Sequence, residues 1–343
     1  MRNLVAVIVI SMLLLYGCSS SGSTSGKSGA APQVNYRSGT QGITMSFLAS
    51  NPADRTFDGG PLPITLDVRN LGAEDLGTSA NIYLSGFDEK IISGVPKSQP
   101  IGALVGKMNL LSQTEGERTQ VSFDSSSSIQ LSKFNIDSYP VPLRATACYT
   151  YSTVANVLVC VDPDPTSIKR EKVCTAQDVS FSGGQGAPVA VTSVGISSAK
   201  GRTTFTINIQ NAGGGTVFKL GSIDKCDPYS TTAPSFNDFD QVQVDSVQVG
   251  NRNLDCKTKD RSVRLTNNAG FLFCTLDTKG QQLSFQSPLS VKLSYGYRTT
   301  ITKQITIVRS PGSTSPQSAA DTAQRVADTG ANTMGGTSPN NDR

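Results

Sequence analysis

The order of apolar and polar residues predicts short β-strands through most of the chain. From residue 42 onward, apolar residues alternate with polar ones or run for about five positions between Gly, Pro, Asn and Asp. A period of two is typical of strands with one buried face, and the intervening residues favour turns. The expected strands are 43–48, 64–69, 80–84, 119–123, 141–151 and 157–161 in a first block, and 189–197, 203–210, 241–249, 262–265, 270–276, 290–297 and 299–308 in a second.

The spacing of these strands predicts the fold class. Short strands separated by frequent turn signals are typical of sandwiches, so we expect an all-β protein with two immunoglobulin-like antiparallel β-sandwich domains in tandem. A Gly-rich segment, 182–188, is the expected hinge between them. Domain 1 is then 38–182 and domain 2 is 187–309, with residues 88–116 interpreted as an insertion that ends in a short helix.

The first 17 residues have the profile of a signal peptide. A single positive charge precedes an apolar run at 4–16, which is shorter than the roughly 20 residues that a membrane-spanning helix needs. The segment Leu15-Tyr16-Gly17-Cys18 resembles a lipobox, although Tyr16 stands where a small residue is usual. The resemblance implies acyl chains on Cys18 that anchor the protein to the outer face of the cell membrane. The alternatives are an uncleaved signal anchor and a secreted chain.

Two polar segments flank the expected domains. Residues 18–37 are rich in Ser and Gly, and residues 310–343 are rich in Ser, Thr and Pro, so neither can bury much apolar surface. We expect a flexible tether and a disordered tail that carries sites for O-glycosylation. No Asn-x-Ser/Thr triplet occurs in the chain, so N-glycosylation is not expected.

Composition argues against catalysis and against nucleic acid as a partner. The 343 residues include no His and no Trp, and His is the commonest general base and metal ligand. The net charge is only +4, from 30 Lys and Arg against 26 Asp and Glu, and it is spread evenly. We therefore expect neither an enzyme nor a cofactor.

Six cysteines remain when the lipobox Cys18 is set aside. An even number in an exported chain favours disulfides over a metal site, because no Cys-x-x-Cys pair and no His is present. We expect Cys256–Cys274, then Cys148–Cys160 across a hairpin at 152–155, and by elimination Cys174–Cys226.

Other polar patterns have simpler interpretations than chemistry. The paired aspartates at 162/164 and 238/240 could bind Ca²⁺ or act as a glycosidase pair, but turn formation explains them better. The two Ser-x-x-Lys pairs, at 197–200 and 222–225, are expected by chance, and Gly213-Gly214-Gly215 lacks the Lys of a phosphate-binding loop.

Tyrosines are the only candidates for ligand binding. Tyr149 and Tyr151 share one strand face, as do Tyr295 and Tyr297. Such pairs could stack on a sugar, but they more often pack across strands. Tyr149, Tyr151 and Tyr229 are the residues we would test for a ligand.

A repeated element carries a resemblance to a known family. Both 67–72 and 207–213 end an alternating strand in Asn-x-Gly, and the segments Val159-Cys160-Val161-Asp162-Pro163-Asp164-Pro165, Lys172-Val173-Cys174 and 184–192 add to the pattern. Together they resemble archaeal-type surface lipoproteins with CARDB-like, immunoglobulin-like domains. The resemblance implies an exported, non-enzymatic module for surface assembly, adhesion or recognition.

We therefore expect a lipid-anchored cell-surface protein with a structural, adhesive or protein-interaction role, engaging an unknown surface protein or glycan. One alternative is an accessory lipoprotein that captures a carbohydrate or other cargo. Another is a subunit of a surface filament or envelope assembly.

Overall fold

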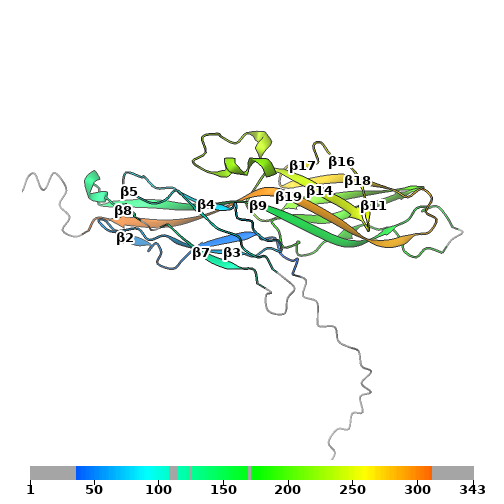
Figure 1. Ribbon diagram of the computed structural model, residues 1–343, viewed down its shortest axis with the longest axis horizontal. Coiled ribbons are helices and arrows are strands. Elements are labelled where there is room, and N and C mark those ends of the chain that lie inside the picture. Colours follow the sequence, from blue (N-terminus) through cyan, green and yellow to red (C-terminus); the bar gives the residue numbers. More distant parts are fainter. Residues whose placement is uncertain (1–35, 108–114, 124–125, 169–170, 311–343) are drawn as a thin grey trace, which may run out of the picture. The chain divides into compact units, whose positions relative to one another are not determined.

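The computed structural model describes residues 36–107, 115–123, 126–168 and 171–310, which lie within one compact unit. These residues are mostly antiparallel β-strand, with a few short 3-10 helices (Figure 1). The expected all-β class is confirmed, whereas the tandem of two immunoglobulin-like domains is not. The signal peptide, Cys18, nearly all of the tether and the tail from 311 onward lie outside the described residues.

The strands and 3-10 helices follow one another along the chain in this order. The first block contains β1 Ile43–Phe47, β2 Arg55–Phe57, β3 Thr65–Asn70, β4 Asn81–Ser85, β5 Ile92–Ser93, β6 Ser98–Pro100, β7 Arg118–Ser122, β8 Ser128–Ile129, η1 Leu131–Phe134 and β9 Ser138–Val161. The second contains β10 Val179–Ser180, β11 Val189–Ala199, β12 Arg202–Asn211, β13 Thr216–Phe218, η2 Leu220–Cys226, η3 Phe236–Asp238, β14 Gln241–Val249, β15 Arg252–Asn253, β16 Asp255–Lys257, β17 Ser262–Arg264, β18 Ala269–Asp277 and β19 Phe285–Val308.

Two long strands, β9 and β19, organise the fold. Each has 24 residues, and they pair antiparallel over their whole length. In β9 the odd-numbered residues from 141 to 161 are nearly all buried, because alternate side chains of a strand point to opposite faces. We expected two strands here with a turn at 152–155. The turn does not occur, since Thr153 and Ala155 continue the buried alternation and are both fully inaccessible.

The strands form sandwich-like layers around a continuous core. A nine-stranded sheet contains the path β15-β14-β19-β9-β4-β6, and two smaller sheets have the orders β1-β3-β7 and β10-β11-β12-β18-β16. Most of their buried apolar side chains make one cluster. The end of β19 pairs with β2 of the first block, so the two blocks share strands. The expected hinge is also partly internal, because Gln185 and Ala187 are buried.

The two blocks repeat one another about the centre of β9 and β19. Tyr149 pairs with Tyr297, and Tyr151 pairs with Tyr295. An offset of 146 positions in the sequence relates Tyr149 to Tyr295 and Tyr151 to Tyr297. β4 pairs with β9 as β14 pairs with β19, and the order β1-β3-β7 recurs as β11-β12-β18. An approximate twofold relation therefore centres on the paired residues Thr150 and Gly296.

All six expected cysteines form disulfides, and one of the three expected pairings is confirmed. Cys256 on β16 lies opposite Cys274 on β18 and is bonded to it. The short segment between them reverses the chain, which is why their spacing in the sequence was informative.

The other two expected pairings are wrong. The observed disulfides are Cys148–Cys226 and Cys160–Cys174. Cys148 and Cys160 lie on the same continuous strand, roughly 40 Å apart at about 3.3 Å per residue, whereas disulfide Cα atoms lie within about 7 Å. The expected hairpin is absent, so each cysteine of β9 bonds to a different loop segment. The third pairing, reached by elimination, fails with it.

Candidate binding groove

A segment between β13 and β14 covers part of the outer face of the nine-stranded sheet. We call residues 219–240 the covering segment; it includes η2 and η3 and lies against β9 and β19 (Figure 1). The Cys148–Cys226 disulfide attaches it to β9. Phe218 packs beside this disulfide in a small cluster, with Tyr83, Ile223 and Phe239 at its border. The segment explains why Thr146 and Cys148 are buried at outward positions of β9.

Asp238 holds the covering segment in shape. Its carboxylate accepts hydrogen bonds from the Ser222 hydroxyl at 2.7 Å, the Lys225 ammonium at 2.9 Å, and the Ser235 backbone N–H and hydroxyl, each at 2.7 Å. These bonds, that of Ser222 foremost, hold the pKa of Asp238 well below its usual value. The carboxylate is therefore ionised at neutral pH and balances the charge of Lys225.

A groove of about 460 Å³ lies between the covering segment and the sheet. Pro228, Ala233 and Pro234 supply apolar surface on the side of the covering segment. The polar lining consists mainly of hydroxyl and cationic groups, with a single carboxylate: Ser85, Thr146, Ser230, Thr232, Thr300, Arg144, Lys225, Arg298 and Asp227. Such a lining favours a polar ligand that carries negative charge.

Two arginines of the groove have no carboxylate partner among the described residues. Arg298 on β19 is half-buried; its guanidinium lies 5.4 Å from the centre of the Phe218 ring and donates to the Thr216 hydroxyl at 3.3 Å. Burial lowers the pKa of Arg298 from its usual value, although the guanidinium remains charged. Arg144 on β9 is exposed and forms no ion pair within the described ranges. The groove thus has uncompensated positive charge.

Removing the Cys148–Cys226 disulfide is expected to loosen this groove. The bridge joins residues 78 positions apart, so replacing both cysteines with alanine should lower the free energy of unfolding by about 2–4 kcal/mol. Chemical denaturation measures the loss, and hydrogen exchange of residues 219–240 measures the loosening. The matched control removes Cys256–Cys274, which joins residues only 18 apart and lies elsewhere. Equal exchange of the covering segment in both variants would contradict this role.

The predicted ligand candidates Tyr149 and Tyr151 are core residues. Both are buried, with exposed fractions of 1% and 4%, as are Tyr295 and Tyr297. The four rings lie edge-to-face or tilted with centroids about 6 Å apart. Burial raises the pKa of Tyr149 and Tyr151 well above the usual value, so their hydroxyls stay protonated. They therefore cannot present an open stacking surface for a sugar.

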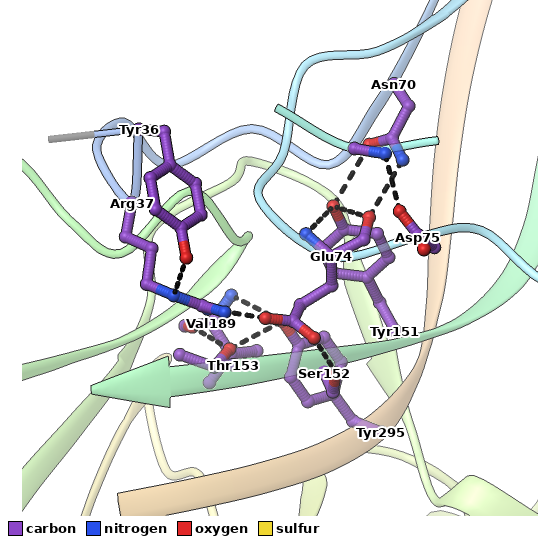
Figure 2. A network of polar contacts seen from close by, with 11 residues as sticks. Tyr36, Arg37, Asn70, Glu74, Asp75, Tyr151, Ser152, Thr153, Val189 and Tyr295 are labelled. Atoms are coloured by element: carbon purple, nitrogen blue, oxygen red, sulfur yellow. Dashed lines mark hydrogen bonds and ion pairs between the residues drawn. The ribbon is translucent and has the colours of Figure 1, made fainter. Parts of the chain in front are cut away.

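The asparagines of the two Asn-x-Gly elements supply hydrogen-bond partners for the buried hydroxyls of Tyr151 and Tyr297. The Tyr151 hydroxyl donates to Asn70 Oδ1 at 3.0 Å, and Asn70 Nδ2 donates to the Glu74 carbonyl at 2.8 Å (Figure 2). In the second block the Tyr297 hydroxyl donates to Asn211 Oδ1 at 3.0 Å. Asn211 Nδ2 likewise donates to a carbonyl four residues on, at 2.9 Å. Each asparagine therefore joins a turn to a tyrosine of the shared strands.

Tyr229, the third candidate, lies on the covering segment. It is partly exposed, its hydroxyl donates to the Leu84 carbonyl, and Lys97 Nζ lies 4.7 Å from the centre of its ring. These contacts connect the segment to β4. The structure therefore brings Tyr229 to the sheet that forms the groove but separates it from Tyr149 and Tyr151.

The remaining polar candidates have structural roles. Asp162 binds Lys172 at 2.8 Å and accepts from the Asp164 backbone N–H, as expected for a turn. Ser222 and Lys225 both bind Asp238 rather than each other. Within the described ranges, no group of three or more His, Cys, Asp or Glu side chains is placed to hold a metal ion.

Sequence reasoning missed Arg144 and Arg298. Each is a long cationic side chain at an outward position of a strand. The available signal was a single arginine two positions from a threonine in each of β9 and β19. Their proximity follows only from the pairing of β9 with β19.

No family model and no curated protein matches the chain. Within the described ranges, every helix is too short or too polar to span a bilayer.

Proposed function

We propose that this protein is a lipid-anchored cell-surface protein that recognises its partner by contact, without catalysis. The observation that carries the proposal is the groove, which presents two arginines without carboxylate partners beside a row of hydroxyl groups. Charged groups that the protein itself leaves unpaired are available to a partner, and loops placed on a rigid scaffold are common binding sites.

The compartment supports this role. Three disulfides indicate an oxidising, extracellular type of environment. The lipobox-like segment at Cys18 supplies the proposed anchor, and the Ser- and Gly-rich tether after it would hold the folded part away from the bilayer.

Non-catalytic action follows from the groups around the groove. The hydroxyls of Thr146 and Thr300 lie 3.2 Å apart and bond to each other, rather than to a base that would activate one of them as a nucleophile, among the residues that the structure describes. The Lys225 ammonium is paired with the Asp238 carboxylate at 2.9 Å. The groove therefore offers mainly positive charge and hydrogen-bonding hydroxyl groups.

We also propose that the two blocks are CARDB-like domains that share β9 and β19. The repeated contacts of Asn70 with Tyr151 and of Asn211 with Tyr297 support a duplication of one domain. Duplication followed by exchange of strand halves would give the observed pairing of Tyr149 with Tyr297.

Replacing Cys18 with serine is expected to release the protein from the membrane. The proposed thioether needs the sulfur of Cys18, so the variant should be found in the medium or the soluble fraction, without acyl mass. Intact mass of the membrane fraction and quantitative immunoblotting of both fractions measure the change.

Cys256→Ser is the control, because it removes a cysteine inside the folded part and should leave the anchor intact. Cys18→Ser protein that stays in the membrane fraction would overturn the anchoring proposal.

A further inference from the structure

The groove is a departure from the twofold repeat of the fold. An offset of 146 residues relates Arg144 on β9 to Ser290 on β19. The same offset relates Ser152 on β9 to Arg298 on β19, so each arginine has a serine at the equivalent position of the other strand. The connection from β12 to β14 has 29 residues, whereas the one from β3 to β4 has 10. The two arginines and the covering segment thus lie at one end of the β9–β19 pair, whereas the other end has serines and a short connection. Features that a duplicated scaffold carries only once are candidates for function rather than for stability.

The arginines flank a pair of hydroxyl groups on the floor of the groove. On neighbouring strands, Thr146 lies opposite Thr300, Arg298 lies opposite Cys148, and Arg144 lies opposite Thr302. Side chains two positions apart on a strand share a face, so the arginines lie on either side of the threonine pair. Their Cα atoms are separated by roughly 13 Å along the strand direction, at about 3.3 Å per residue. Flexible side chains at this spacing can approach one ligand from two sides.

The rest of the lining indicates a hydroxyl-rich ligand. Ser85, Ser230 and Thr232 add hydroxyls that both donate and accept hydrogen bonds, which suits the hydroxyls of a sugar. Proline surfaces can pack against the apolar face of a sugar ring. The volume of about 460 Å³ lies within the range of small-molecule sites. The absence of any aromatic side chain from this lining argues against nucleic acid, whose bases stack on aromatic rings.

We propose that the groove binds an acidic saccharide, whose carboxylate or sulfate group pairs with Arg144 and Arg298 while the sugar hydroxyls meet the Ser and Thr side chains. Guanidinium groups match planar or tetrahedral oxyanions through paired hydrogen bonds. Lys225 adds weaker attraction because Asp238 already binds it. This inference deepens the proposed surface recognition and rests on it.

Calorimetric titration of the full chain in detergent tests the proposal. Four probes are compared: an oligouronate, a sulfated oligosaccharide, a neutral oligosaccharide of the same length, and inorganic sulfate. We expect saturable binding of at least one acidic oligosaccharide, weaker at high salt, and no measurable binding of the neutral one. The uronate and sulfate arms identify which oxyanion the groove prefers.

The matched variants are Arg144→Ser and Arg298→Ser, which introduce the residue found at the equivalent positions of the other block. Each is expected to weaken binding about tenfold or more, because each removes the charge-assisted hydrogen bonds that one guanidinium donates to the oxyanion. Lys292→Ser is the control: Lys292 is an exposed cation of β19 outside the groove lining. Far-UV circular dichroism and thermal unfolding verify that all three variants fold.

Three outcomes would overturn the proposal. The first is binding that is unchanged in the Arg144→Ser/Arg298→Ser double variant or equal for the neutral oligosaccharide. The second is inorganic sulfate binding as tightly as the acidic oligosaccharide, which would make the groove a general anion site. Failure of all four probes also overturns it, yet leaves membrane anchoring of the Cys18 form untouched, so the two proposals fail separately.

Discussion

Replacing Gly72 with alanine is expected to destabilise the protein by more than about 4 kcal/mol. A Cβ atom at this position would lie 1.9 Å from the Tyr151 hydroxyl and 2.7 Å from the Gly186 carbonyl oxygen. Overpacking a rigid site costs about 1–3 kcal/mol, and displacement of Tyr151 would also break its buried hydrogen bonds to Asn70 and Glu74. Chemical denaturation, monitored by tyrosine fluorescence and circular dichroism, measures the loss.

Gly77→Ala is the matched control for this substitution. Gly77 lies in the same connection, has no atom within 4 Å of an added Cβ, and does not adopt a positive φ. Its replacement should change the free energy of unfolding by less than about 1 kcal/mol. Equal effects of the two substitutions would show that Tyr151 can move away without cost, which contradicts its role as a fixed contact.

The sequence allowed the strands to be predicted because their alternation is local. Most expected strands coincide with observed ones within a few residues. The continuity of β9 could not be predicted, because Ser152 and Thr153 are typical of turns when taken alone. In the structure the Thr153 hydroxyl donates to the Val189 carbonyl at 2.6 Å, so a polar residue is satisfied in the middle of a buried strand. Only the tertiary partner makes that position a strand.

The groove could not be predicted from the sequence either, because its residues come from distant parts of the chain. Arg144 and Arg298 are 154 positions apart, and nothing local connects them. Cys148 was recognised as a disulfide cysteine, but its partner depended on whether β9 turned back on itself. Candidate residues that lie on one element could therefore be identified from the sequence. The position of a site between the two blocks could not, because it depends on the register of β9 against β19.

The Asn-x-Gly elements link the sequence pattern to the stability of both blocks. As a local signal, Asn-x-Gly indicates only a sharp turn. In the structure the asparagine side chain bonds the turn to a tyrosine of the shared strands, once through Asn70 and once through Asn211. Disruption of either asparagine should therefore loosen the layer that its block contributes, together with the centre of β9 and β19.

Replacing Asn70 with aspartate is expected to cost about 4–6 kcal/mol at neutral pH. The Asn70 side chain is fully buried, and Nδ2 donates to the carbonyls of Glu74 at 2.8 Å and Leu104 at 3.1 Å. A carboxylate of the same shape would place a charged oxygen against both carbonyl oxygens and remove the amide donor that each now shares. Each unsatisfied buried group costs about 1–3 kcal/mol, and a charge costs more.

The pH dependence of this variant identifies the cause. Burial and the facing carbonyls would raise the pKa of the new carboxyl in the folded state, so the folded protein would bind its proton more tightly than the unfolded chain. The deficit relative to the unmodified protein should therefore shrink as pH falls from 7 towards 4, where the neutral acid can donate to one of the two carbonyls. Asn81→Asp provides the control, because the Asn81 amide makes one exposed hydrogen bond, to the Ser79 carbonyl. A deficit for Asn70→Asp that does not change with pH would mean that lost packing, rather than the buried charge, destabilises the variant.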